Sequence, residues 1–176
     1  MSKSSSEKRS RRILVIDDNE AVLNSIVVAL SGAGYDVIAT QQTVGAARHL
    51  KGCELVIIDY HMPGLDGGDV VRSLRAAAAG LQATPAFYMY TSDLLLEQKP
   101  KELGFDGVFT RKGQGAWLAH QVEAAFRLLD LAARTRASTP KQEARPAPQD
   151  VGSKRPGPPA KPSASWKVEP GTNPKK

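Results

Sequence analysis

The sequence predicts an α/β protein with a doubly wound, five-stranded parallel sheet. Five short runs rich in Val and Ile alternate with longer segments whose apolar residues recur at helical spacing. Five strand–helix units within about 120 residues are typical of a small parallel sheet with helices on both faces. If the strand order is 2-1-3-4-5, the first and third strands are neighbours at the point where the order reverses.

The predicted strands are short apolar runs, and both the first and the third end in Asp. Runs of this length suit a strand buried in a parallel sheet. In chain order they are Ile13–Asp17, Tyr35–Ala39, Leu55–Asp59, Ala86–Tyr90 and Gly107–Thr110.

Four of the segments between and after these strands have helical spacing of their apolar residues. They predict helices over residues 20–31, 43–51, 67–79 and 115–135. The remaining helix should lie in residues 94–104, where Pro100 disfavours an uninterrupted helix. We therefore expect that helix to be short, broken or restarted at Pro100.

Charge is distributed unevenly along the 176 residues. Residues 1–12 hold five Lys/Arg and one Glu, residues 136–176 hold nine Lys/Arg and three Asp/Glu, and the middle carries a net charge of −4. Nine of the twelve prolines lie at or after Pro140, in a stretch too poor in apolar residues to form a core. We expect a basic disordered arm over 1–10, a folded domain over 11–134 and a disordered Pro/Lys-rich tail over 135–176.

Composition argues against several classes of protein. No apolar run approaches the roughly 18 residues of a membrane-spanning helix, and no apolar stretch follows the basic N-terminus closely enough for a secretory signal. The single cysteine, Cys53, cannot form an internal disulfide or a Cys-rich metal site. We expect a cytoplasmic protein without membrane contact.

Carboxylates at the strand ends are the main chemical signal. Asp17 and Asp18 follow the first apolar run, and Asp59 ends the third. If these strands are neighbours, the three carboxylates converge at the carboxyl edge of the sheet, where a cation would offset their repulsion. Hard oxygen ligands suit Mg²⁺. The alternative is structural, because Asp is also favoured at helix N-caps and in turns.

Four motifs together resemble the receiver domain of bacterial two-component response regulators. They are, in order, ILVIDDNE, VIIDYHMPGLDG, FYMYTSD and GVFTRKG, and the resemblance covers residues 11–134. It implies a flavodoxin-like fold with the strand order 2-1-3-4-5, and a phosphoacceptor switch rather than an enzyme acting on a free substrate. Only Mg²⁺-dependent self-phosphorylation and dephosphorylation are then expected.

The resemblance also implies a role for each matching position. Asp59 is the phosphoacceptor, while Asp17, Asp18 and Asp59, with the backbone carbonyl of His61, hold Mg²⁺. His61 has the spacing of a residue at the rim of the pocket, although plain solvent exposure fits it equally well.

Three further positions match the family pattern. Thr91 contacts the phosphoryl group, Lys112 pairs with Asp59 or its phosphate, and Phe109 is the switch aromatic. Each also has a plainer explanation, because Thr91 could cap a helix, Lys112 could be a solvated loop lysine and Phe109 could be a core side chain.

The residue after Lys112 departs from the family pattern. Receivers commonly have Pro after this lysine, with a cis bond, but here Gly113 follows. A cis bond without proline costs roughly 2.5–4 kcal/mol, so we expect a trans or flexible loop.

The resemblance implies a stand-alone, chemotaxis-type or phosphorelay receiver. A histidine kinase or histidine phosphotransfer protein is the expected donor, and docking to an unidentified target protein is the expected output. Two alternatives remain. One is a pseudo-receiver that is never phosphorylated. The other is nucleic-acid binding, possible only through the basic tails, where Trp166 is the only aromatic residue available for stacking.

Overall fold

The computed structural model describes residues 10–138. The predicted basic arm before Ser10 and the Pro/Lys-rich tail after Ser138, including Trp166, lie outside the described residues. The three-part division of the chain therefore stays a prediction. Within the described residues, no helix has the length and apolar character needed to cross a membrane.

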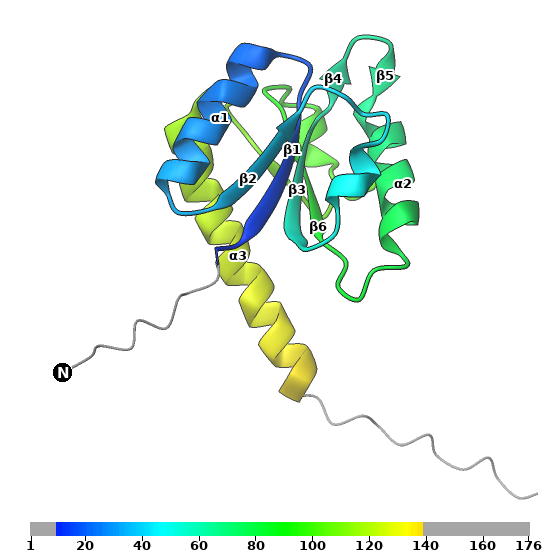
Figure 1. Ribbon diagram of the computed structural model, residues 1–176, viewed down its shortest axis with the longest axis vertical. Helices are drawn as coiled ribbons and strands as arrows, with labels where there is room; N and C mark the ends of the chain where they lie inside the picture. The colour runs from blue at the N-terminus through cyan, green and yellow to red at the C-terminus, as the bar shows by residue number, and fades with distance from the viewer. Residues whose placement is uncertain (1–9, 139–176) are drawn as a thin grey trace, which may run out of the picture. The chain divides into compact units, whose positions relative to one another are not determined.

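The core of the structure is a five-stranded parallel sheet with the order β2-β1-β3-β6-β7 (Figure 1). This confirms the predicted order, because the two short strands β4 and β5 lie outside this sheet. The strands are β1 (Arg12–Ile16), β2 (Asp36–Thr40), β3 (Cys53–Asp59), β6 (Ala86–Tyr90) and β7 (Gly107–Phe109).

The sequence did not predict the small antiparallel hairpin that follows β3. It consists of β4 (His61–Met62) and β5 (Leu65–Asp66). Gly64 occupies its turn with φ 73°, a conformation that glycine adopts without the steric cost of a Cβ. Asp66 then caps α2, because its side chain accepts a hydrogen bond from the amide of Gly68 at 2.7 Å.

Three α-helices cover the two faces of the sheet. α1 (Glu20–Gly32) and α3 (Gly115–Ser138) lie on one face, and α2 (Gly67–Ala78) lies on the other (Figure 1). Asn19 begins α1 by accepting hydrogen bonds from the amides of Ala21 and Val22. The predicted helix 115–135 continues in the structure to Ser138.

The predicted helix over 43–51 is wrong in kind and length. The structure has only a 3₁₀ helix, η1 (Ala46–His49). Gly45 and Gly52 flank it with φ values of 78° and 80°, so backbone outside the right-handed helical region bounds it on both sides. The expectation of a short helix near Pro100 is confirmed, because only the 3₁₀ helix η2 (Leu96–Gln98) forms there.

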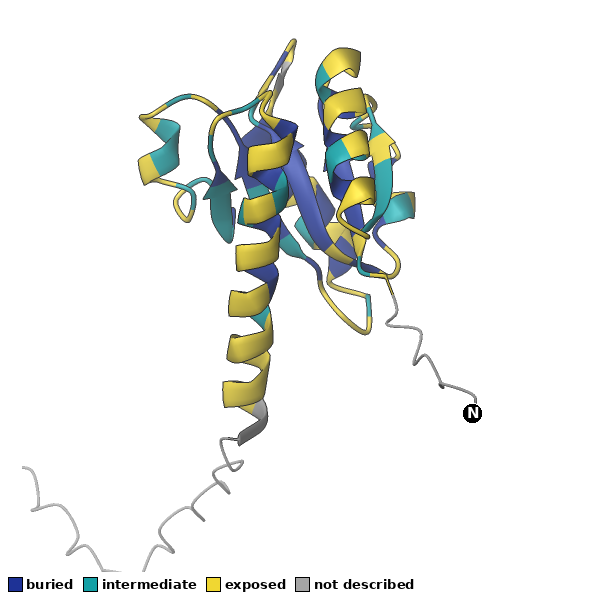
Figure 2. Ribbon diagram, turned by 90° about the vertical axis from the view of Figure 1, so that its left-hand side faces the viewer, coloured by how far each residue is buried: buried dark blue, intermediate teal, exposed yellow. Residues whose placement is uncertain are grey.

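Alternating side chains of the strands form two core layers. In β1, Leu14 and Ile16 pack toward the α2 side, while Ile13 and Val15 pack toward the α1 and α3 side. Buried residues make up most of β1, β3 and β6 and the inner faces of the helices (Figure 2). Because helices cover both faces of the sheet, polar side chains of its central strands gather at the strand ends.

Candidate functional site

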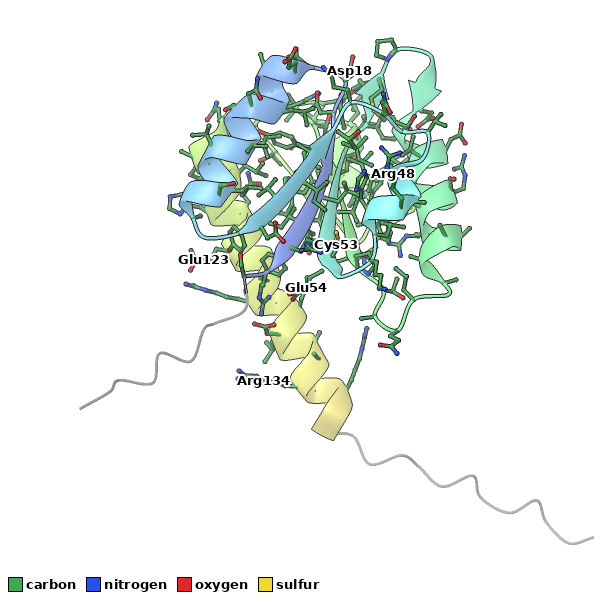
Figure 3. All side chains as sticks on the ribbon, in the orientation of Figure 1. Asp18, Arg48, Cys53, Glu54, Glu123 and Arg134 are labelled. Atoms are coloured by element: carbon green, nitrogen blue, oxygen red, sulfur yellow. The ribbon has the colours of Figure 1, made fainter. Side chains whose placement is uncertain are left out.

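Asp17, Asp18 and Asp59 lie together at the carboxyl edge of the sheet. Asp17 directly follows β1 and Asp59 ends β3, and these strands pair in parallel with Ile16 opposite Ile58. Figure 3 shows Asp18 at this edge, with Cys53 and Glu54 at the opposite end of the sheet. Asp17 and Asp59 are 1% and 2% exposed, whereas Asp18 is exposed to solvent.

The three carboxylates have the chemistry of a divalent-cation site. One oxygen from each lies within 4.8 Å of the others. The Oδ2 atoms of Asp17 and Asp59 are buried, and both face the ammonium of Lys112. One ammonium does not neutralise three carboxylates, and buried carboxylate charge is costly unless cations offset it. The residues present therefore fit a hard cation such as Mg²⁺.

Lys112 provides the positive charge within this cluster. Its Nζ lies 2.9 Å from Oδ2 of Asp17 and 2.5 Å from Oδ2 of Asp59, and its side chain is only 22% exposed. Burial lowers the pKa of Lys112, but the two carboxylates outweigh that effect and raise its pKa above the usual value. Lys112 therefore stays protonated and bridges the first and third strands.

Asp59 is held by two groups of different kinds. Its Oδ1 accepts a hydrogen bond from the amide of His61 at 3.1 Å, while its Oδ2 contacts Lys112. Burial raises the pKa of Asp59, and the charge of Asp17 adds to this effect. Lys112 and the His61 amide only partly offset it, so the charged form of Asp59 gains further from an added cation.

Thr91 directly follows β6, and Phe109 ends β7. Thr91 is 1% exposed, and its Oγ1 accepts a hydrogen bond from the amide of Asp93 at 3.0 Å. Its own amide donates to the carbonyl of Phe109 at 3.1 Å. Phe109 is 2% exposed and stacks on Tyr88 with 4.6 Å between ring centroids. The backbone of Thr91 is therefore bonded to that of Phe109, while its hydroxyl closes the turn to Asp93.

His61 lies at the rim of the site with an exposed side chain. Its Nε2 is 3.5 Å from Oδ2 of Asp93, so the two loops after β3 and β6 meet across the rim. The amide of Leu95 donates to the Asp93 side chain at 2.9 Å and lowers the pKa of Asp93. The sequence analysis missed Asp93, although its position two residues after Thr91 is typical of a turn closed by a threonine hydroxyl.

The loop that carries Lys112 is free of cis bonds. The described residues contain no cis peptide, so the expectation of a trans bond before Gly113 is confirmed. Gly113 has φ 90°, which proline cannot adopt because its ring holds φ near −65°. The glycine at this position therefore belongs to a different loop conformation from one built on proline.

Comparison with known sequences identifies the family. The response regulator receiver domain matches residues 13–112. The chain belongs to this family. Receiver domains are phosphoacceptor switches of two-component systems, they bind Mg²⁺ at an acidic pocket and they interact with histidine kinases or phosphotransfer proteins.

Two curated relatives share the receiver sequence. The sensory/regulatory protein RpfC of Xanthomonas campestris is 34% identical over 142 residues, covering 79% of this chain and 18% of that protein. The DNA-binding response regulator MtrA of Mycobacterium tuberculosis is 38% identical over 69 residues, covering 38% of this chain and 30% of that protein. The chain thus spans less than a third of either relative.

Solved structures agree with the fold. The chemotaxis response regulator CheY4 of Vibrio cholerae superposes with a TM-score of 0.55 at 22% sequence identity, covering 65% of this chain and 98% of that one. This likeness supports the flavodoxin-like sheet order.

Proposed function

We propose that this receiver accepts a phosphoryl group on Asp59 from a phosphohistidine and signals by phosphorylation-dependent docking to another protein. One observation carries the proposal. Asp59 is a buried carboxylate at the carboxyl end of a central strand, and it lies against Lys112 and within a cluster that fits Mg²⁺. Buried charged groups gathered in this way are typical of functional sites.

The reaction transfers one phosphoryl group to the carboxylate. An oxygen of Asp59 attacks phosphorus, the P–N bond of the phosphohistidine breaks, and the imidazole leaves with the electron pair of that bond and takes a proton. The product is an acyl phosphate on Asp59. Such a transfer depends mainly on positioning and on neutralising the charge of the phosphoryl oxygens.

Different residues around Asp59 would position the phosphoryl group and neutralise its charge. Asp17, Asp18 and Asp59 would hold Mg²⁺, with the backbone carbonyl of His61 as the further predicted ligand, and the ion when bound neutralises phosphoryl oxygen charge. Lys112 changes partner, because its ammonium can move from the carboxylate of Asp59 to the new phosphate. The Thr91 hydroxyl accepts from Asp93, so its own proton is available to donate to a phosphoryl oxygen.

The output follows from the charge that the reaction adds. A phosphoryl group brings about −1.5 to −2 charge at neutral pH. A Thr91 hydroxyl drawn toward that group pulls on the β6–β7 pair, since the Thr91 amide is bonded to the carbonyl of Phe109. Phe109 and Tyr88 then repack and change the surface near β7, which supports a switch read by a partner protein.

Phosphorylation by a small donor tests the proposal. Purified protein is incubated with Mg²⁺ and acetyl phosphate, beside an Asp59→Asn variant, and intact mass is measured. We expect one added phosphoryl group in the wild type and none in the variant. Full modification of Asp59→Asn would overturn the assignment of Asp59.

A folded protein that gains no phosphoryl group would have two explanations: a pseudo-receiver, or a competent receiver that needs a specific kinase. A Mg²⁺ titration separates them, because the competent receiver still binds the ion. Absence of Mg²⁺ binding would favour the pseudo-receiver.

A further inference from the structure

Tyr90, the strand residue before Thr91, contacts the backbone of the residues on both sides of Lys112. We propose that Tyr90 is a positioning residue for Lys112, holding the lysine loop where its ammonium reaches Asp59 and the phosphoryl group. The inference rests on the proposed function, which it extends to a residue that the sequence analysis placed only at the end of a strand.

The loop from Arg111 to Gln114 is a tight turn with Lys112 near its tip. The carbonyl of Arg111 accepts a hydrogen bond from the amide of Gln114 at 3.2 Å. Gly113 has φ 90°, the positive value that the third position of a type II turn requires. Arg111 also has a positive φ of 58°, which is unfavourable for a residue with a side chain. This turn therefore needs support from outside itself.

The hydroxyl of Tyr90 supplies that support on both sides of Lys112. It accepts a hydrogen bond from the amide of Gly113 at 2.9 Å and donates to the carbonyl of Arg111 at 3.4 Å. Burial raises the pKa of Tyr90, so the phenol keeps the proton that it donates. The two residues that flank Lys112 are thereby tied to one side chain.

These two hydrogen bonds form a clamp on the lysine loop, and the buried ring of Tyr90 fixes its position. Tyr90 is 1% exposed and belongs to the core layer that faces α1 and α3. On the sheet, Tyr90 pairs in register with Asp59, and Thr91 is the next residue. The residue that holds the lysine loop therefore lies beside Asp59 on the neighbouring strand, and Thr91 directly follows it.

A second contact on the loop acts differently. The guanidinium of Arg111 lies 4.5 Å from the centre of the Trp117 ring, which is 43% exposed. This stacking restrains the side chain of Arg111 and not the backbone that carries Lys112. Tyr90 instead holds the backbone on both sides of Lys112. Because Gly113 and not proline follows this lysine, no proline ring restricts the loop.

The test uses Tyr90→Phe, which keeps the ring and removes the hydroxyl. With acetyl phosphate and Mg²⁺, we expect the phosphorylation rate constant at saturating donor to fall roughly five- to tenfold, as expected for the loss of one or two hydrogen bonds. The donor concentration for half-maximal rate should change little, because the clamp positions Lys112 and does not bind the donor. Tyr35→Phe is the matched control, since Tyr35 packs against the same core layer at a distance from the loop.

A double-mutant cycle shows whether Tyr90 acts through Lys112. Tyr90→Phe is measured again in a Lys112→Gln background, where we expect it to have no further effect on the rate. The same fold-loss in both backgrounds would overturn the inference, because Tyr90 would then act on some other part of the site. An unchanged rate for Tyr90→Phe alone would also overturn it.

Hydrogen exchange separates failure of the clamp from failure of the proposed function. In Tyr90→Phe, we expect faster amide exchange over residues 111–114 than in the wild type or in Tyr35→Phe, with or without phosphorylation. If the wild type takes up no phosphoryl group but exchange rises as expected, only the proposed function fails. Unchanged exchange in Tyr90→Phe would overturn the clamp whatever the wild type does.

Discussion

The Nζ atom of Lys112 lies 2.5 Å from Oδ2 of Asp59. The same ammonium is 2.9 Å from Oδ2 of Asp17, so one cation faces two buried carboxylates. The remaining negative charge is what makes the pocket receptive to a divalent ion, and the contact itself places the lysine where a phosphoryl group would arrive.

Removing this ammonium should destabilise the fold. Lys112→Met leaves Asp17 and Asp59 buried without their cation, and we expect a loss of about 1–3 kcal/mol in the free energy of unfolding. Urea denaturation measures it, with the exposed Lys101→Met as the control. A Lys112→Met protein as stable as the control would show that the carboxylates do not depend on the lysine.

Mg²⁺ should stabilise the protein through the acidic cluster. At about 100 times its dissociation constant, a ligand that binds only the folded state adds about 2.7 kcal/mol. Because Asp18 is exposed, Asp18→Asn should leave the metal-free stability nearly unchanged but greatly reduce the shift of Tm with Mg²⁺. Asp69→Asn, an exposed carboxylate on α2, is the control. An equal Mg²⁺ shift in wild type and Asp18→Asn would contradict this site.

Cys53 should be unreactive while the protein is folded. Its side chain is 4% exposed, its Sγ donates to the carbonyl of His49 at 3.0 Å, and burial raises its pKa from 9.0 to about 11. Since Cys53 is the only cysteine, iodoacetamide labelling at neutral pH reports on it alone, and we expect labelling only as fast as the chain opens. Rapid labelling of the native protein would contradict this burial.

The raised pKa of Cys53 also implies a pH dependence of stability. The thiol gives up its proton more readily in the unfolded chain, so its contribution is full below pH 9.0 and is lost as pH rises through about 11. The stability of the wild type relative to Cys53→Ala should therefore fall over that interval, by on the order of 2 kcal/mol. A difference that stays constant from pH 8 to pH 11 would argue against the shift.

Gly115 should tolerate no side chain, because α1 and α3 approach closely there. A Cβ at this position would lie 2.8 Å from the carbonyl oxygen of Ser25 and 3.0 Å from Cβ of Ala29. We expect Gly115→Ala to cost about 1–3 kcal/mol in thermal or urea unfolding. Gly80→Ala is the matched control, with nothing within 4 Å and an expected change inside about 0.5 kcal/mol. Equal effects of the two would contradict the close packing.

Much of the fold and of the acidic site could be predicted from local pattern. The apolar runs specified the strands, and the runs ending at Asp17 and Asp59 placed carboxylates at one sheet edge because parallel strands end together. The segment 43–51 was harder, since its apolar spacing suits a helix while Gly45 and Gly52 bound a shorter 3₁₀ turn. Apolar spacing over so short a segment does not distinguish a 3₁₀ turn from an α-helix.

The sequence by itself determined the alternation of strands and helices and the chemical types at the site, because apolar periodicity and strand-end carboxylates are local features of the chain. Tertiary structure alone decided which of those groups touch. The ammonium of Lys112 meets two carboxylates from different strands, and the Tyr90 hydroxyl spans the loop around that lysine from 21 and 23 residues away. Such contacts depend on how strands pack side by side, and no spacing along the chain encodes them.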